Sequence, residues 1–163
     1  MRNATLRPWR LTADQTGVVF TVPGIAQPKG SPEHFSLPSG RVAVTERGPH
    51  KDWQAQVRLE AGVAMLRCGR KALLDGPLSV ALSFFLPRPK SAPKTVRTLP
   101  QVRPDADKLA RCVLDGLNGV VFRDDGQICR LAAWKAYSAR PRVEVAVFPV
   151  TEEQLAWLDG EEA

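Results

Sequence analysis

The stretch Arg103–Gln127, RPDADKLARCVLDGLNGVVFRDDGQ, concentrates acidic residues in an otherwise basic chain. The whole sequence has 23 Lys and Arg residues against 17 Asp and Glu residues, yet this stretch holds five aspartates: Asp105, Asp107, Asp115, Asp124 and Asp125. Two like charges about 4 Å apart repel by roughly 4 kcal/mol at an effective dielectric of about 20. If the fold brings these carboxylates together, we expect a bound cation to offset their repulsion.

The first half of this stretch predicts an amphipathic helix. Pro104 suits a first helical turn, and Asp105 suits the N-cap region. At about 100° per residue, a polar arc separates from a wider apolar arc. The polar arc consists of Asp107, Lys108, Arg111 and Asp115, and the apolar arc of Leu109, Ala110, Val113, Leu114 and Leu117. Asn118-Gly119 predicts the helix end, because glycine tolerates the left-handed cap conformation.

The second half of the stretch predicts a corner between two strands. Val120–Phe122 is a short apolar run that favours a strand. Arg123–Gly126 predicts a turn, and Gln127 begins the next strand.

Acidic pairs at the helix start (Asp105, Asp107) and at the corner (Asp124, Asp125) suggest a metal site. Mg²⁺ prefers carboxylate oxygens and water, and ions held in this way activate water for attack on a phosphodiester. Other interpretations stay open. The i, i+4 spacing along the polar arc also builds ion pairs on a solvated helix face, and an aspartate near a helix start interacts favourably with the macrodipole. Asp125-Gly126 is also an ordinary hairpin signal.

Several short blocks resemble the signature of the RusA-like Holliday junction resolvases, which are endodeoxyribonucleases found in phages and prophages. The blocks are Arg-Pro-Asp105-Ala-Asp107, Leu109, Asp115-Gly-Leu-Asn and Asp124-Asp125-Gly-Gln-Ile. The resemblance implies that Asp105, Asp107 and Asp125 bind the metal, with Asp124 and Asp115 at further acidic positions. It also implies Mg²⁺ as the cofactor, with Mn²⁺ as an alternative, and a homodimer in which each subunit nicks one strand of a four-way junction.

Two residues depart from the family pattern. Lys108 stands where the family has Asn, and Arg111 stands where it has a catalytic Lys. Arginine stabilises negative charge on phosphate but does not readily give up a proton, so a general-acid role at Arg111 is in doubt. Two alternatives therefore stand beside a Mg²⁺-dependent, structure-selective junction resolvase. One is a catalytically inactive module that binds branched DNA, and the other is a structural basic protein without a nucleic-acid role.

Basic residues in several parts of the chain predict contacts with DNA. A net charge of +6 and a pI of about 9.7 suit a polyanionic partner. Residues 87–104 contain five prolines, five basic residues and no acid, which predicts a flexible basic loop that follows phosphates. The predicted DNA-binding residues are Lys29, Arg88, Lys90, Lys94, Arg97, Arg103 and Lys108. Lys135 and Arg111 are candidates for stabilising charge in the transition state.

The order of the remaining segments predicts one α+β domain with a mixed sheet and helices packed mainly on one face. A basic arm at 1–16 precedes a domain at 17–150, and a short helix with an acidic tail occupies 151–163. Alternating apolar residues predict strands at 18–22, 78–86, 127–137 and 142–148, and a hairpin arm at 41–45. An apolar stripe with i, i+4, i+8 spacing that includes Trp53 predicts a helix at 51–67. RusA-like proteins are expected to share this architecture.

The cysteines and the lengths of the apolar segments indicate in which cellular compartment the protein is expected. Cys68, Cys112 and Cys129 are far apart and odd in number, which favours a reducing compartment. The N-terminal residues lack an apolar signal segment, and no apolar run is long enough to span a membrane. We therefore expect a cytoplasmic protein in a bacterial or phage-infected cell.

Overall fold

The computed structural model describes residues 17–30, 33–36, 42–45, 48–93 and 98–151. In chain order the elements are β1 (Val18–Pro23), β2 (Glu33–Ser36), β3 (Val42–Thr45), α1 (Pro49–Arg67), β4 (Leu78–Leu86), α2 (Ala106–Leu117), the 3-10 helix η2 (Asp125–Gln127), β5 (Ile128–Tyr137) and β6 (Arg142–Pro149). The predicted arm at 1–16 and all but the first residue of the predicted C-terminal helix and tail lie outside the described residues.

A four-stranded mixed sheet organises the domain, with the strand order β1-β6-β4-β5. β4 runs parallel to β5 and antiparallel to β6, so that Val80 lies between Leu131 and Val147. β1 closes one edge by pairing antiparallel with β6. β5 forms the opposite edge of the sheet.

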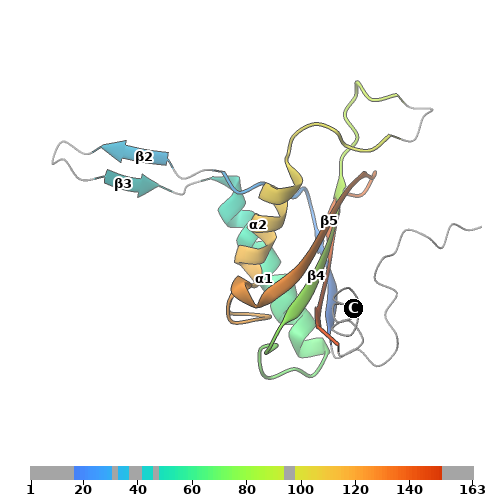
Figure 1. Ribbon diagram of the computed structural model, residues 1–163. Coiled ribbons are helices and arrows are strands. Elements are labelled where there is room, and N and C mark those ends of the chain that lie inside the picture. The colour runs from blue at the N-terminus through green and yellow to red at the C-terminus, as the bar shows by residue number, and fades with distance from the viewer. Residues whose placement is uncertain (1–16, 31–32, 37–41, 46–47, 94–97, 152–163) are drawn as a thin grey trace, which may run out of the picture.

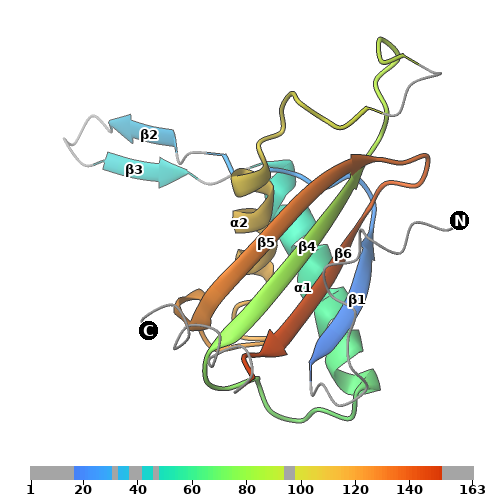
Figure 2. The same ribbon diagram turned by 45° about the vertical axis from the view of Figure 1, so that its right-hand side comes forward.

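Both long helices cover the same face of this sheet (Figures 1 and 2). Leu78, Val80, Leu82 and Phe84 alternate along β4, and all are buried at 1% exposure or less. They form one core with residues of both helices, including Val57 of α1. This arrangement confirms the predicted α+β fold. Alternate side chains of the strands point toward the helices and are buried together with the wide apolar arc of α2. Within the described ranges, no helix combines the length and apolar content that crossing a membrane requires.

The hairpin of β2 and β3 forms a separate two-stranded sheet that projects away from the domain (Figure 1). The expected arm at 41–45 corresponds to β3. Its partner β2 was not predicted as a strand, since the surrounding residues are rich in proline and glycine and show little alternation.

The prediction of a strand at Val120–Phe122 is wrong. Gly119 has φ 75° and turns the chain immediately after α2, and Phe122 makes only isolated bridges to Leu74 and Asn118. Val121 and Phe122 are fully buried, so this apolar run fills the core below the helix end. The expected turn that follows contains the 3-10 helix η2.

Candidate functional site

The start of α2 presents two carboxylates to solvent. Asp105 is the N-cap residue, but its side chain makes no capping hydrogen bond. Its carboxylate is 44% exposed, and Oδ2 lies 3.3 Å from Nζ of Lys108. Asp107 lies in the first turn and is exposed. Both carboxylates therefore stand at the positive end of the helix macrodipole, which interacts favourably with negative charge.

The other acidic pair belongs to η2. Asp124 caps this short helix, and its Oδ1 accepts a hydrogen bond from the backbone N–H of Gly126 at 2.8 Å. Gln127 completes a capping box, because its Oε1 accepts from the N–H of Asp124 at 3.3 Å. Its Nε2 also donates to the carbonyl oxygens of Leu74 and Gly76. Asp124 thus shapes the corner, whereas Asp125 is exposed in the first turn of η2.

The first acidic pair lies at the start of α2, whereas the second belongs to η2, which follows the other end of that helix in the chain. The 12 residues of this helix span about 18 Å at about 1.5 Å per residue. Across the described residues, no group of three or more His, Cys, Asp or Glu side chains is arranged to hold a metal ion. A single chain therefore does not gather Asp105, Asp107, Asp124 and Asp125 into the cluster that their spacing suggested.

Lys135 connects the end of β5 to the start of α2. Its Nζ donates to the carbonyl oxygens of Pro104 at 2.9 Å and Val102 at 3.1 Å. The side chain therefore lies near the acidic helix start, and it also fixes the backbone that leads into α2. Arg111 is exposed on α2, one turn after Lys108.

Lys29 lies in an ion pair within the chain. Its Nζ is 2.7 Å from Oδ2 of Asp115, and both side chains are mostly buried at 20% and 24% exposure. The same carboxylate oxygen accepts from Nε2 of Gln54 at 3.1 Å, and the backbone N–H of Lys29 donates to the carbonyl of Lys108. This fifth aspartate of the acidic stretch therefore binds the 25–30 segment to both helices.

The described parts of the basic loop lie next to the start of α2, where both line the same hollow. Arg88, Lys90 and Arg103 are exposed, and the guanidinium of Arg88 lies 5.5 Å from the centroid of the Tyr137 ring. Lys94 and Arg97 lie outside the described residues. A hollow of about 580 Å³ separates the loop from the 25–30 segment and the start of α2.

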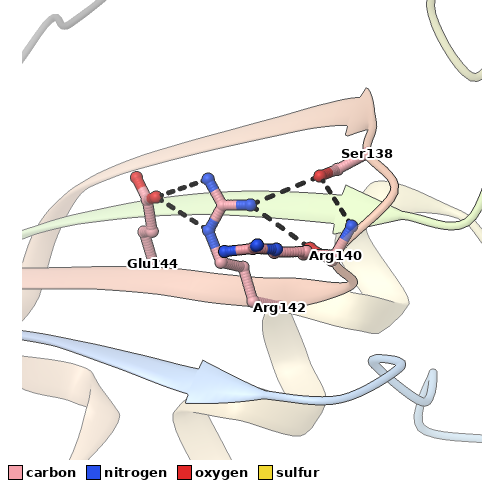
Figure 3. Close-up of polar contacts among 4 residues, drawn as sticks. All are labelled: Ser138, Arg140, Arg142 and Glu144. Carbon is pink, nitrogen blue, oxygen red and sulfur yellow. Dashed lines mark hydrogen bonds and ion pairs between the residues drawn. The ribbon is translucent and has the colours of Figure 1, made fainter.

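Arg142 stabilises the turn that follows β5, a role that sequence reasoning missed. Figure 3 shows its guanidinium between Glu144, which accepts at 2.8 and 3.0 Å, and Ser138 with the backbone of Arg140. The guanidinium also lies 3.7 Å from the centroid of the Phe85 ring. The i, i+2 placement of Arg142 and Glu144 on one strand face was the available signal.

The fold and the site together define a class: a basic α+β domain that exposes carboxylates at a helix start beside a proline-rich basic loop. The family model described as "Endodeoxyribonuclease RusA" matches residues 26–148. The chain belongs to this family, which confirms the resemblance in the acidic stretch and implies nuclease activity on branched DNA. The chain is also 29% identical over 143 residues to the uncharacterized protein YqaN of Bacillus subtilis (strain 168), covering 82% of this chain and 97% of YqaN.

Proposed function

We propose that this protein is a Mg²⁺-dependent, structure-selective endodeoxyribonuclease that resolves four-way DNA junctions by paired phosphodiester hydrolysis in the cytoplasm. The observation that carries the proposal is family membership, together with the half-exposed Asp105 and the exposed Asp107 at the start of α2. The basic loop and Arg103 adjoin these carboxylates, so a DNA backbone drawn to the loop meets the acidic helix start.

The donor set suits Mg²⁺, but one chain supplies only part of a site. Asp105, Asp107 and Asp125 offer carboxylate oxygens, which Mg²⁺ prefers, whereas the length of α2 separates the first two from the third. We infer that a second copy of the chain supplies the missing carboxylate.

The edge strand β5 gives a physical basis for such a dimer. Its outer edge is unpaired within the four-stranded sheet, and Leu131 and Trp134 near its centre are 47% and 48% exposed. A long edge strand with exposed apolar side chains favours pairing with another strand. A second β5 aligned antiparallel would pair this edge and place neighbouring side chains beside Leu131 and Trp134.

Antiparallel pairing would also bring the two halves of the site together. β5 begins directly after η2, which holds Asp125, and ends beside the start of α2, where Lys135 binds the carbonyl of Pro104. A two-fold axis that passes between the two β5 strands, level with their middles, would therefore place Asp125 of the partner subunit near Asp105 and Asp107. Two such composite sites per dimer fit the two nicks that resolve a junction.

Each basic residue of the site then has a definite task. Mg²⁺ bound there would orient and activate the attacking water. Arg111 and Lys108 lie on the exposed arc of α2 and stabilise negative charge on the phosphate. Lys135 positions the backbone at the helix start through its bonds to Val102 and Pro104.

Cleavage of a synthetic four-way junction tests the proposal. We expect paired nicks with Mg²⁺, and none with EDTA or with the Asp107→Asn variant. Linear duplex DNA of the same sequence serves as the control for structure selectivity. Cleavage that persists in EDTA, or that Asp107→Asn leaves unchanged, would contradict the proposed site.

A second candidate is a module that binds branched DNA without cutting it. The observation that favours it is the ion pair between Lys108 and Asp105, which places an ammonium group on a carboxylate needed for metal binding. This candidate predicts tight junction binding with no product in Mg²⁺ or Mn²⁺. A Lys108→Asn variant would then gain cleavage.

A further inference from the structure

The hollow beside the start of α2 is partly open and is lined by the 25–30 segment, the loop, the start of α2 and the end of β5. The 25–30 segment contributes Ala26 and Pro28, and the loop contributes Pro87 and Val102. Tyr137, at the end of β5, and Asp105 also line it. Its volume of about 580 Å³ lies within the roughly 300–1,000 Å³ of ordinary ligand pockets.

The walls of the hollow are held in place before any ligand binds. Lys135 fixes the loop side through the carbonyl oxygens of Val102 and Pro104. Lys29 fixes the opposite side through Asp115 and through its backbone bond to Lys108. The hollow is therefore pre-formed, which reduces the entropy that a ligand must overcome.

The lining specifies a flat, apolar ligand attached to a negative charge. Proline rings, aliphatic side chains and the ring of Tyr137 make most of the wall, and such surfaces accept the face of an aromatic ring. Arg103 also lines the hollow and supplies positive charge for a phosphate, as does Lys108, whose Nζ lies 3.3 Å from the carboxylate of Asp105. A nucleotide combines these two parts, with the base joined to its phosphate through one sugar.

We propose that this hollow receives an unpaired nucleobase from the branch point of the DNA, while the adjoining phosphate lies at Asp105 and Asp107. This inference rests on the proposed function and names how the site selects its substrate. Extruding a base costs least where the duplex is already interrupted, so a base pocket beside the scissile phosphate favours branched DNA over continuous duplex. An apolar wall supplies stacking more than edge recognition, so it accepts bases of different sequence.

Binding to modified junctions tests the pocket without relying on cleavage. Each nucleotide at the branch point is replaced in turn by 2-aminopurine or by an abasic analogue, and the wild-type protein is used in EDTA. We expect a fluorescence change only for the two branch-point 2-aminopurines related by the two-fold axis of the dimer, and about tenfold weaker binding when both of these bases are removed. The same substitutions within the duplex arms should have no effect.

Protein variants then place the base in this hollow. Val102 lines the hollow and is 65% exposed, so Val102→Trp fills space without disturbing the core. Leu66→Trp is the matched control, because Leu66 is 76% exposed on α1 and is not part of the hollow. Val102→Trp should reduce the difference between intact and abasic junctions to below about twofold, whereas Leu66→Trp should preserve it.

The outcomes separate the two proposals. Junction binding that is unaffected by every abasic substitution would overturn the base pocket and leave the nuclease proposal standing. An abasic effect of equal size in Val102→Trp and Leu66→Trp would place the base elsewhere and also overturn it. No preference for junction over duplex would contradict the proposed function itself.

Discussion

The Nζ atom of Lys29 lies 2.7 Å from Oδ2 of Asp115 and joins the segment after β1 to helix α2. Both side chains are mostly buried, so Asp115→Ala leaves the ammonium of Lys29 without its counter-ion. We expect a loss of about 1–3 kcal/mol in the free energy of unfolding, measured by urea denaturation. The exposed pair Lys108–Asp105 provides the control, since Lys108→Ala should change stability by about 0.5 kcal/mol or less. Equal effects of the two variants would mean that Lys29 and Asp115 contribute no more than a surface pair.

Gly116 allows α1 and α2 to approach each other. A Cβ atom at this position would lie 2.9 Å from Cγ1 of Val57 and 3.1 Å from the carbonyl oxygen of Gln54. We expect Gly116→Ala to destabilise the protein by about 1–3 kcal/mol, although alanine has the higher helix propensity. Gly62→Ala in α1 is the matched control, because a Cβ there meets nothing within 4 Å and should add about 0.5–1 kcal/mol. Thermal melts of both variants measure these opposite changes in stability. A Gly116→Ala variant that is more stable than wild type would contradict the close contact between the helices.

Lys135 should act as a positioning residue for the backbone that enters α2. Lys135→Met keeps the aliphatic stem but removes both hydrogen bonds, to Val102 and Pro104. We expect faster hydrogen exchange and faster proteolysis at residues 98–104, with the melting temperature lowered by only a few degrees. Lys135→Arg, which retains a donor, should restore part of the protection. A variant that loses cleavage with no change in exchange would instead assign Lys135 to the chemistry.

Burial raises the pKa of the Cys112 thiol to about 11, and the charge of Asp115 acts in the same direction. The unfolded thiol ionises near 9.0, so between these two values the unfolded state loses a proton that the folded state keeps. Stability should therefore fall as pH rises from about 9 to about 11. The difference between wild type and Cys112→Ala, measured by chemical denaturation across this range, isolates the contribution of this thiol. A difference independent of pH would contradict it.

Alkylation of the cysteine thiols provides a second test, of how accessible each thiol is. Cys68 and Cys129 are exposed, whereas Cys112 is fully buried and protonated at neutral pH. Iodoacetamide at pH 8 should label the first two, as followed by mass spectrometry, and should reach Cys112 only after denaturation.

Local periodicity made much of this fold predictable. The apolar arc of α2 and the alternation along β4 match buried positions, because both patterns are set by geometry within a single element. The same reliance on local pattern gave the wrong prediction at Val120–Phe122. Three consecutive apolar residues suit a strand, but the turn at Gly119 directs them into the core instead.

The site was less predictable, because spacing in the sequence does not give distance in space. The acidic motifs indicated the residue types, but the structure shows that the length of α2 separates Asp107 from Asp124. The pairing of Lys29 with Asp115 depends on two segments far apart in the chain, and neither segment alone contains that information.

Mixing two inactive variants tests whether each site is shared between subunits. In a composite site, the Asp107→Asn chain and the Asp125→Asn chain are inactive alone. A mixed dimer of the two contains one site with both substitutions and one site with neither. Purified through two different tags, this mixed dimer should nick one strand of a four-way junction.

The reciprocal pairing makes this result unambiguous. A chain carrying both Asp107→Asn and Asp125→Asn, paired with a wild-type chain, places one substitution in each composite site, so this dimer should be inactive. If every subunit built its own site, the two results would be reversed, because the wild-type chain would cut in the second dimer and neither chain would cut in the first. The pattern of nicks on end-labelled strands therefore distinguishes a shared site from a self-contained one.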